Sequence, residues 1–261
     1  MNSRTGTSRT SKSRPLLFAL TLAAPFALAA CSGGDSAVEG GTSGEPIPAI
    51  EAPEGTSSWT EVATRTADGL GVIVGNPDAP LKLTEYASHT CGACANFAVQ
   101  GKEPLKEYIK TGVVSFEQRE VFLNFVDVII ASLVQCGPKE RVQPLSDEVW
   151  RNLQTVMQGA QNNEQAIEAA GQLPREERFV ALGEATGLID FFAARGLPAD
   201  QARSCLADIE KIEAMDKGAS AKAEEVGVTG TPTFTLNDAK LDENQWPGIE
   251  PILQRAGARQ E

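Results

Sequence analysis

The spacing of hydrophobic residues divides the chain into strand-forming and helix-forming parts. Short apolar runs bounded by turn residues predict strands at 72–74, 81–86, 113–122 and 232–236. A repeat of three to four residues predicts a helix over 91–110, with Thr90 as its N-cap. A strand, a helix and a strand in succession indicate a parallel pair joined by a crossover helix.

The middle of the chain differs, because residues 124–225 show helical spacing and no convincing strand pattern. Prolines of the kind that begin helices divide this part, at Pro144, Pro174 and Pro198. Strand character then returns, and the last predicted elements are a turn at 237–240, a short strand from Leu241 and a helix over 246–256. The order predicts an α/β domain over 67–261, with an inserted helical subdomain at about 124–225.

The first 30 residues predict a signal peptide, because four basic residues and no acidic one precede an apolar run over 15–30. The run is shorter than the roughly 20 residues that cross a bilayer, and Pro25 interrupts it. An uncleaved membrane helix is the alternative. Leu28-Ala29-Ala30-Cys31 resembles the lipobox of bacterial lipoproteins. That resemblance implies lipidation at Cys31 and a periplasmic protein anchored to a membrane by lipid.

Residues 31–66 are rich in Gly, Ser, Glu and Pro, which predicts a flexible tether, because such a segment buries too little apolar surface to become ordered. Past residue 30 the chain has 19 basic and 35 acidic residues, and aromatic residues make up 6% of the sequence. This charge argues against a nucleic-acid partner and favours a monomer, since like-charged chains repel each other.

Candidate chemistry is concentrated at Cys91-Gly92-Ala93-Cys94, where the predicted helix begins directly after a strand. Unpaired N–H groups and the helix dipole favour an anion there, so they stabilise a Cys91 thiolate, the nucleophilic form. Cys94 lies one turn later and can attack a mixed disulfide that Cys91 has formed. The other interpretations are a static disulfide and half of a zinc site, although a zinc site needs further ligands and only His89 lies near.

The stretch GNPDAPLKLTEYASHTCGACANF (75–97) resembles the thioredoxin-fold disulfide oxidoreductases of the DsbA-like family. Gly230-Thr231-Pro232-Thr233-Phe234 resembles the family's loop in which the proline is cis and faces the active cysteines. The long helical insertion is also typical of the family. The resemblance covers roughly 72–256 and implies a thioredoxin-like fold, no bound cofactor or metal, and substrate binding by Thr231 and Pro232.

Glu85 lies six residues before Cys91, where the resembled family has a buried acidic residue. The two-residue period of a strand places it on the same face as Leu81 and Leu83. A carboxyl group in phase with leucines is expected to be buried, with its pKa raised by desolvation. Such a group can hold or pass a proton near Cys94. The alternative is a solvated carboxylate at the end of a strand.

His89 is a candidate modulator that would lend positive charge to the Cys91 thiolate; the alternative is a surface loop residue. The best-known oxidases of the resembled family carry a proline–histidine pair between the cysteines, where this chain has Gly92 and Ala93. The chain therefore departs from the pattern associated with very strong oxidants.

Cys136 and Cys205 remain, an even number in a compartment that permits disulfides. A structural bridge is the first interpretation, and two buried thiols or a second redox pair are the alternatives. Both cysteines fall in the predicted helical subdomain.

Together these features predict an extracytoplasmic enzyme that oxidises the thiols of secreted proteins and is recharged by a membrane redox partner. A disulfide reductase or isomerase of the same fold is one alternative. A metal-binding chaperone that uses Cys91, Cys94 and His89 is another.

The lipid anchor predicts the behaviour of a Cys31→Ser variant. Without the acceptor thiol the precursor is expected to stay uncleaved, to run as a larger protein, and to leave the membrane fraction. Cell fractionation and mass measurement test this. If the variant still needs detergent for extraction and keeps the mass of the wild type, a membrane-spanning helix holds the protein instead.

Overall fold

The computed structural model describes residues 44–260. The predicted signal peptide, the predicted lipidation site at Cys31 and the first part of the predicted tether lie outside these residues. Among the described residues, no helix is both long enough and apolar enough to span a membrane.

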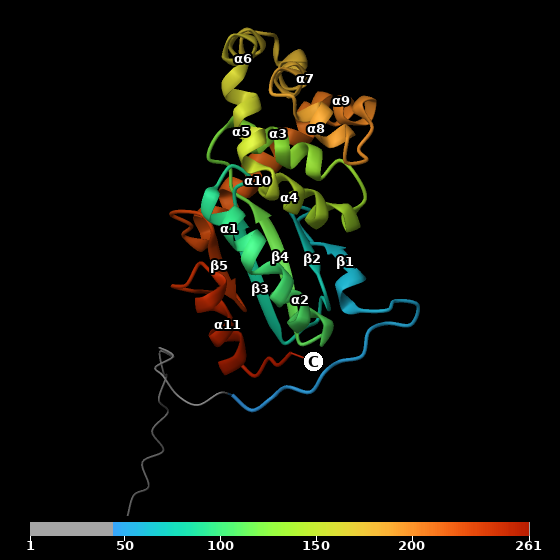
Figure 1. Cartoon of the computed structure of the whole chain (residues 1–261), viewed down its shortest axis with the longest axis vertical. Helices are drawn as coiled ribbons and strands as arrows, with labels where there is room; N and C mark the ends of the chain where they lie inside the picture. The colour runs from blue at the N-terminus through green and yellow to red at the C-terminus, as the bar shows by residue number, and fades with distance from the viewer. Residues whose placement is uncertain (1–43, 261) are drawn as a thin grey trace, which may run out of the picture. The chain divides into compact units, whose positions relative to one another are not determined.

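A six-stranded mixed sheet forms the centre of the described domain, in the order β1-β2-β4-β3-β5-β6 (Figure 1). The strands are β1 (Ala63–Arg65), β2 (Gly71–Val74), β3 (Leu81–Ala87), β4 (Val114–Glu120), β5 (Thr233–Leu236) and β6 (Ala239–Lys240). β3 and β4 are parallel, as predicted, and every other neighbouring pair is antiparallel. β3 is therefore an inner strand, and the loop that follows its carboxyl end starts between β4 and β5.

Two helices, α1 (Gly92–Gln100) and α2 (Lys102–Lys110), connect β3 to β4 and lie across the face of these strands in Figure 1. The prediction of one continuous helix is wrong. Pro104 cannot donate an N–H to the carbonyl group four residues earlier, and its ring crowds that carbonyl, so the helix breaks near Gly101. On the same face, α11 (Trp246–Arg255) completes a core made of Leu83, Phe97, Leu105, Phe116, Phe234, Ile249 and their neighbours.

All eight helices between β4 and β5 belong to the insertion. They are α3 (Phe125–Val134), α4 (Val142–Arg151), α5 (Leu153–Asn162), α6 (Glu164–Gly171), α7 (Arg175–Ala185), α8 (Leu188–Ala193), α9 (Ala199–Ala207) and α10 (Ile209–Val226). They bury a second apolar core that includes Ile129, Leu133, Val149, Leu188, Phe192 and Leu206. Figure 1 shows most of them gathered at the end of the sheet where β3 ends and α1 begins.

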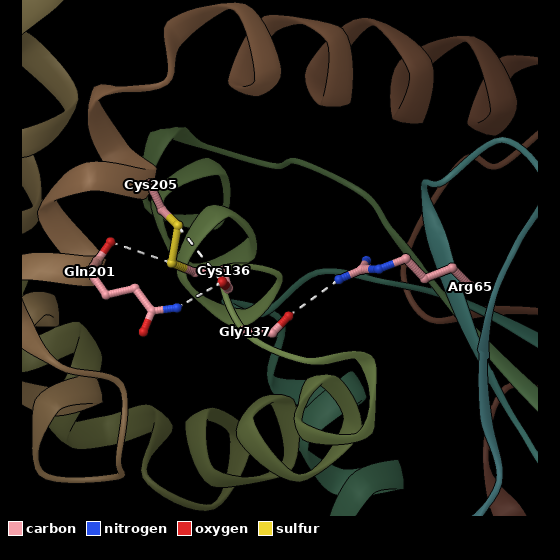
Figure 2. Close-up of a disulfide and its surroundings, with 5 residues drawn as sticks. All are labelled: Arg65, Cys136, Gly137, Gln201 and Cys205. Carbon is pink, nitrogen blue, oxygen red and sulfur yellow. Dashed lines mark hydrogen bonds between the residues drawn. A yellow bond between two sulfur atoms is a disulfide. The ribbon is translucent and has the colours of Figure 1, made fainter.

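A disulfide joins Cys136, just after α3, to Cys205 in α9, with the two Cα atoms 5.8 Å apart (Figure 2). The Gln201 amide donates to the Cys136 carbonyl oxygen (3.2 Å), and Arg65 in β1 donates to the Gly137 carbonyl oxygen (3.4 Å). The bonded cysteines are 69 residues apart. In the chain-entropy model, closing a loop of this length stabilises the fold by up to about 4 kcal/mol.

The prediction of a flexible tether is wrong for residues 44–66. The Gly44 N–H donates to the Arg255 carbonyl oxygen (2.9 Å), and the Trp59 indole N–H donates to the Ile50 carbonyl oxygen (2.7 Å). Trp59 is buried in the core beneath α2. A few apolar side chains and backbone hydrogen bonds therefore hold residues 44–66 against the domain, although the average composition of this segment is polar.

The last hairpin also differs from its prediction, because β6 begins at Ala239 and not at Leu241. Asn237 and Asp238 have φ values of 49° and 67°. Two successive residues with positive φ form the tight two-residue turn that suits paired antiparallel strands. The turn is therefore shorter than predicted. The short edge strand β1 was not predicted at all.

Candidate active site

Cys91 is itself the N-cap of α1, which corrects the assignment of Thr90 to that position. Its sulfur accepts a hydrogen bond from the Cys94 backbone N–H (3.3 Å). Cys91 is half-buried, Cys94 is fully buried, and both are free thiols, so the structure shows the dithiol form. One sulfur is accessible and the other lies a turn deeper in the helix.

The Thr231–Pro232 segment lies against Cys91 although 140 residues separate them in the chain. The Cys91 thiol donates to the Thr231 carbonyl oxygen (3.3 Å), and the Thr231–Pro232 peptide bond is cis. The segment leads into β5, which pairs with β3, so sheet pairing places it beside the dithiol. It also borders a hollow of about 300 Å³, lined by residues 229–233 and 240–244.

The two thiols differ in acidity. A hydrogen bond from the Cys94 side chain is the main cause that lowers the pKa of Cys91 to about 5, with further hydrogen bonds from the Thr231 side chain and from the N–H groups of Cys94 and Ala93. Burial raises the pKa of Cys94 far above its ordinary value. At neutral pH the accessible sulfur is thus a thiolate and the buried sulfur a thiol.

Glu85 lies in β3, fully buried, as its phase with the neighbouring leucines suggested. Burial raises its pKa to about 8, and the positive charge of Lys102 partly opposes this. Within the described residues neither carboxylate oxygen has a hydrogen-bond partner. A neutral acid with nothing to hold its proton is suited to proton exchange with a nearby group.

Lys102 is a buried cation that the sequence reasoning missed. Its ammonium group lies 2.6 Å from the Asp147 carboxylate, 3.2 Å from the Gln143 amide oxygen and 4.3 Å from the centre of the Trp150 ring. The partners come from α4, so the insertion supplies the groups that keep this charge buried. A signal existed, because Lys102 falls in the helical phase of the apolar residues that follow it, where a solvated lysine is not expected.

His89 is fully buried, so its interpretation as a surface residue is wrong. One ring nitrogen lies 3.0 Å from the Ser146 hydroxyl, the other 3.1 Å from the Glu120 carboxylate but poorly aligned with it, and the ring stacks on Trp150. Both nitrogens are therefore directed at groups other than Cys91. In residues 44–260 no three His, Cys, Asp or Glu side chains converge as metal ligands.

Comparisons with known proteins agree with this geometry. A family model described as Thioredoxin matches residues 68–254. No curated protein matches the sequence. A solved protein-disulfide isomerase from Novosphingobium aromaticivorans is 24% identical over 70% of this chain and 95% of its own, with a TM-score of 0.65.

Two further solved structures are similar. Alpha-DsbA1 from Wolbachia pipientis is 20% identical over 70% of this chain and 90% of its own, with a TM-score of 0.55. MdbA, a thiol-disulfide oxidoreductase from Corynebacterium diphtheriae, is 16% identical over 76% of this chain and 94% of its own, with a TM-score of 0.50. These likenesses confirm the predicted thioredoxin-like α/β fold, with helices added to it.

Replacing Glu85 with Gln should change how stability depends on pH. The pKa of Glu85 rises from 4.5 to about 8 on folding, so the neutral form stabilises the fold fully below pH 4.5. That contribution is lost as the pH rises toward 8. From about pH 5 to 8, the wild type should lose a few kcal/mol more unfolding free energy than Glu85→Gln.

Urea unfolding of both reduced proteins provides the measurement. The Cys91 thiolate acts in the opposite sense, because its pKa falls on folding, but it is present in both proteins and cancels in the difference. Parallel stability profiles for the two proteins would show that Glu85 does not carry a raised pKa.

Proposed function

Because the chain belongs to the thioredoxin family and has the fold of thiol-disulfide oxidoreductases, we propose that it oxidises the dithiols of proteins outside the cytoplasm. One observation carries the proposal. Cys91, accessible and with a pKa near 5, lies one turn before Cys94, which is buried and remains protonated. This asymmetry gives each sulfur a separate task.

The reaction begins with the Cys91–Cys94 disulfide. A substrate thiolate attacks the Cys91 sulfur, the S–S bond breaks, and Cys94 leaves with the electron pair and takes up a proton. The second substrate thiolate then attacks the substrate sulfur of the mixed disulfide and releases Cys91 as a thiolate. Two electrons pass from the substrate to the protein, and the substrate gains a disulfide. Attack at Cys91 is favoured because it is the accessible sulfur and, with its low pKa, the better leaving group in the second step.

Glu85 supplies the proton that Cys94 needs when it leaves, and takes it back when the dithiol is reoxidised. A pKa near 8 allows the carboxyl group to be protonated at neutral pH and still to give up its proton. Lys102 and Asp147 lie close enough to Glu85 for their charges to shift its pKa, and both line a cavity of about 520 Å³. They offer a polar route by which the proton on Glu85 exchanges with solvent.

Thr231 and Pro232 align the substrate. The hollow beside them runs past the segment whose carbonyl oxygen touches Cys91. A substrate chain laid in an extended form along this segment brings a cysteine to the Cys91 sulfur without a deep pocket. Such a groove accepts many sequences, which suits an enzyme that acts on varied secreted proteins.

The stabilised thiolate supports the proposed oxidising direction. A group that stabilises the reduced form makes the disulfide form a stronger oxidant, and the low pKa of Cys91 is such a stabilisation. Gly92 and Ala93 offer no further charge between the cysteines. The protein is therefore an oxidant weaker than the strongest of its kind, and a membrane redox partner returns it to the disulfide form.

The proposed location outside the cytoplasm is inferred from the predicted signal peptide (residues 1–30) and from the predicted lipidation of Cys31. An acidic, monomeric domain held by lipid at a membrane meets secreted proteins as they emerge. A compartment that favours disulfides keeps the Cys91–Cys94 pair oxidised and ready. Residues 44–66 pack on the domain, so this part of the predicted tether is ordered.

Trapping of substrates tests the assignment of the two sulfurs. In Cys94→Ala the Cys91 thiolate can still attack a disulfide of a substrate protein, but no neighbouring thiol can then attack the mixed disulfide and release Cys91, so these adducts should accumulate on nonreducing gels. Cys91→Ala is the matched control and should trap few, because the remaining sulfur is fully buried. Equal trapping by the two variants would remove Cys91 as the attacked sulfur.

A further inference from the structure

Asp127, near the start of α3, is a fully buried carboxylate whose partners are all uncharged donors. One oxygen accepts from the Ser88 hydroxyl (2.8 Å) and the Thr90 N–H (2.8 Å). The other accepts from the Thr90 hydroxyl (3.0 Å) and from the N–H groups of Leu123 (2.9 Å) and Asn124 (3.3 Å). Burying a charge is costly, and such a set of donors is what makes it tolerable.

These donors come from two places. Leu123 and Asn124 lie at the beginning of α3, where an acidic residue at this position commonly closes a capping box. Ser88 and Thr90 lie 37 to 39 residues earlier, in the loop that leads from β3 to Cys91. Helix capping explains the first set only. The second set joins the insertion to the loop of the proposed nucleophile.

That loop is held from a second side as well. The Ser88 carbonyl oxygen accepts from the Cys91 N–H (3.3 Å) and from the Trp150 indole N–H in α4 (3.1 Å). The loop of three residues is therefore fixed between α3 and α4. Cys91 follows directly, so its backbone position depends on the same contacts.

The contacts of the Cys91 sulfur leave little tolerance. Its distances to the Cys94 backbone nitrogen and to the Thr231 carbonyl oxygen are both 3.3 Å. Hydrogen bonds weaken steeply as distance and alignment worsen. A small shift of the loop would lengthen the contact with the Cys94 N–H, which stabilises the thiolate, and would move the sulfur away from the Thr231 segment.

We propose that Asp127 is a positioning residue for the dithiol: through Ser88 and Thr90 it holds the loop so that the Cys91 sulfur meets the Cys94 N–H and the Thr231 segment. The inference rests on the proposed function, in which Cys91 is the attacked sulfur. Asp127 itself touches neither cysteine. Its effect passes through the loop backbone, and the insertion thereby sets the reactivity of the thioredoxin-like part.

The variant Asp127→Asn tests this, because it keeps the size of the side chain but turns one acceptor into a donor that faces other donors. Titration of the Cys91 thiolate by its ultraviolet absorbance should give a pKa raised by about one unit, since the hydrogen bond from the Cys94 N–H, which stabilises the thiolate, weakens. Equilibration with glutathione should show a weaker oxidant, with the equilibrium constant shifted up to about tenfold.

Two loop variants separate positioning from folding, because both keep Asp127 and the hydrogen bonds that it accepts from the Leu123 and Asn124 N–H groups. Ser88→Ala leaves the N-cap residue Asn124 untouched, whereas Thr90→Val also removes the acceptor of the Asn124 side-chain amide (2.9 Å). Thr90→Val removes one hydroxyl donor, and Ser88→Ala removes the other. Each should raise the Cys91 pKa by less than Asp127→Asn does. Val134→Ala is the matched control, since it weakens the buried far end of α3 and should leave the pKa unchanged.

The outcomes are distinct. If Asp127→Asn loses stability while its Cys91 pKa stays at the wild-type value, Asp127 is a helix cap only and the proposal is wrong. If Asp127→Asn does not fold, unchanged pKa values in both loop variants overturn it equally. Failure of the wild type to oxidise protein dithiols would sink the proposed function, but it would not affect these titrations of the protein alone.

Discussion

The position of the Cys91 sulfur, at the first turn of α1 and against the Thr231–Pro232 segment, is the constraint on which the rest of the site depends. The helix supplies the N–H groups that stabilise a thiolate, and the segment supplies a wall along which a substrate chain can lie. Pairing of β5 with β3 brings together parts of the chain that are 140 residues apart. Without this pairing the Thr231–Pro232 segment, the proposed surface for a substrate chain, would not lie beside the cysteine motif.

The insertion supplies polar groups near the dithiol as well as covering one end of the sheet. Asp147 and Trp150 of α4 keep Lys102 buried near Glu85, and Asp127 of α3 holds the loop before Cys91. Each buried charge is costly on its own, and each is compensated by a partner from another element. The helices added to the thioredoxin-like fold thus set the electrostatics around the dithiol.

Features set by neighbouring residues could be predicted from the sequence. The cysteine motif, the strand before it and the burial of Glu85 all follow from short-range spacing. The apolar repeat predicts one helix over 91–110, and its periodicity does not show the break that Pro104 causes. Composition predicts a flexible tether where residues 44–66 are ordered, since it averages out the few apolar contacts that Trp59 and its neighbours make.

Long-range polar contacts could not be predicted in the same way. Nothing local pairs Lys102 with Asp147, 45 residues later, or turns His89 inward to Ser146 and Glu120. Those partners follow from how α4 packs on the sheet. Local sequence patterns therefore identify the reactive cysteines more readily than the distant charged and polar groups that lie around them.

The reduction potential of the Cys91–Cys94 pair, measured by equilibration with glutathione, tests the central claim most directly. A thiolate stabilised at the start of α1, without further charge between the cysteines, predicts a value between about −120 mV and −270 mV, the potentials of DsbA and thioredoxin. A value in that range agrees with a moderate oxidant. A potential more negative than that of thioredoxin would mean that the protein works as a reductase, which would contradict the oxidising role of the Cys91–Cys94 pair.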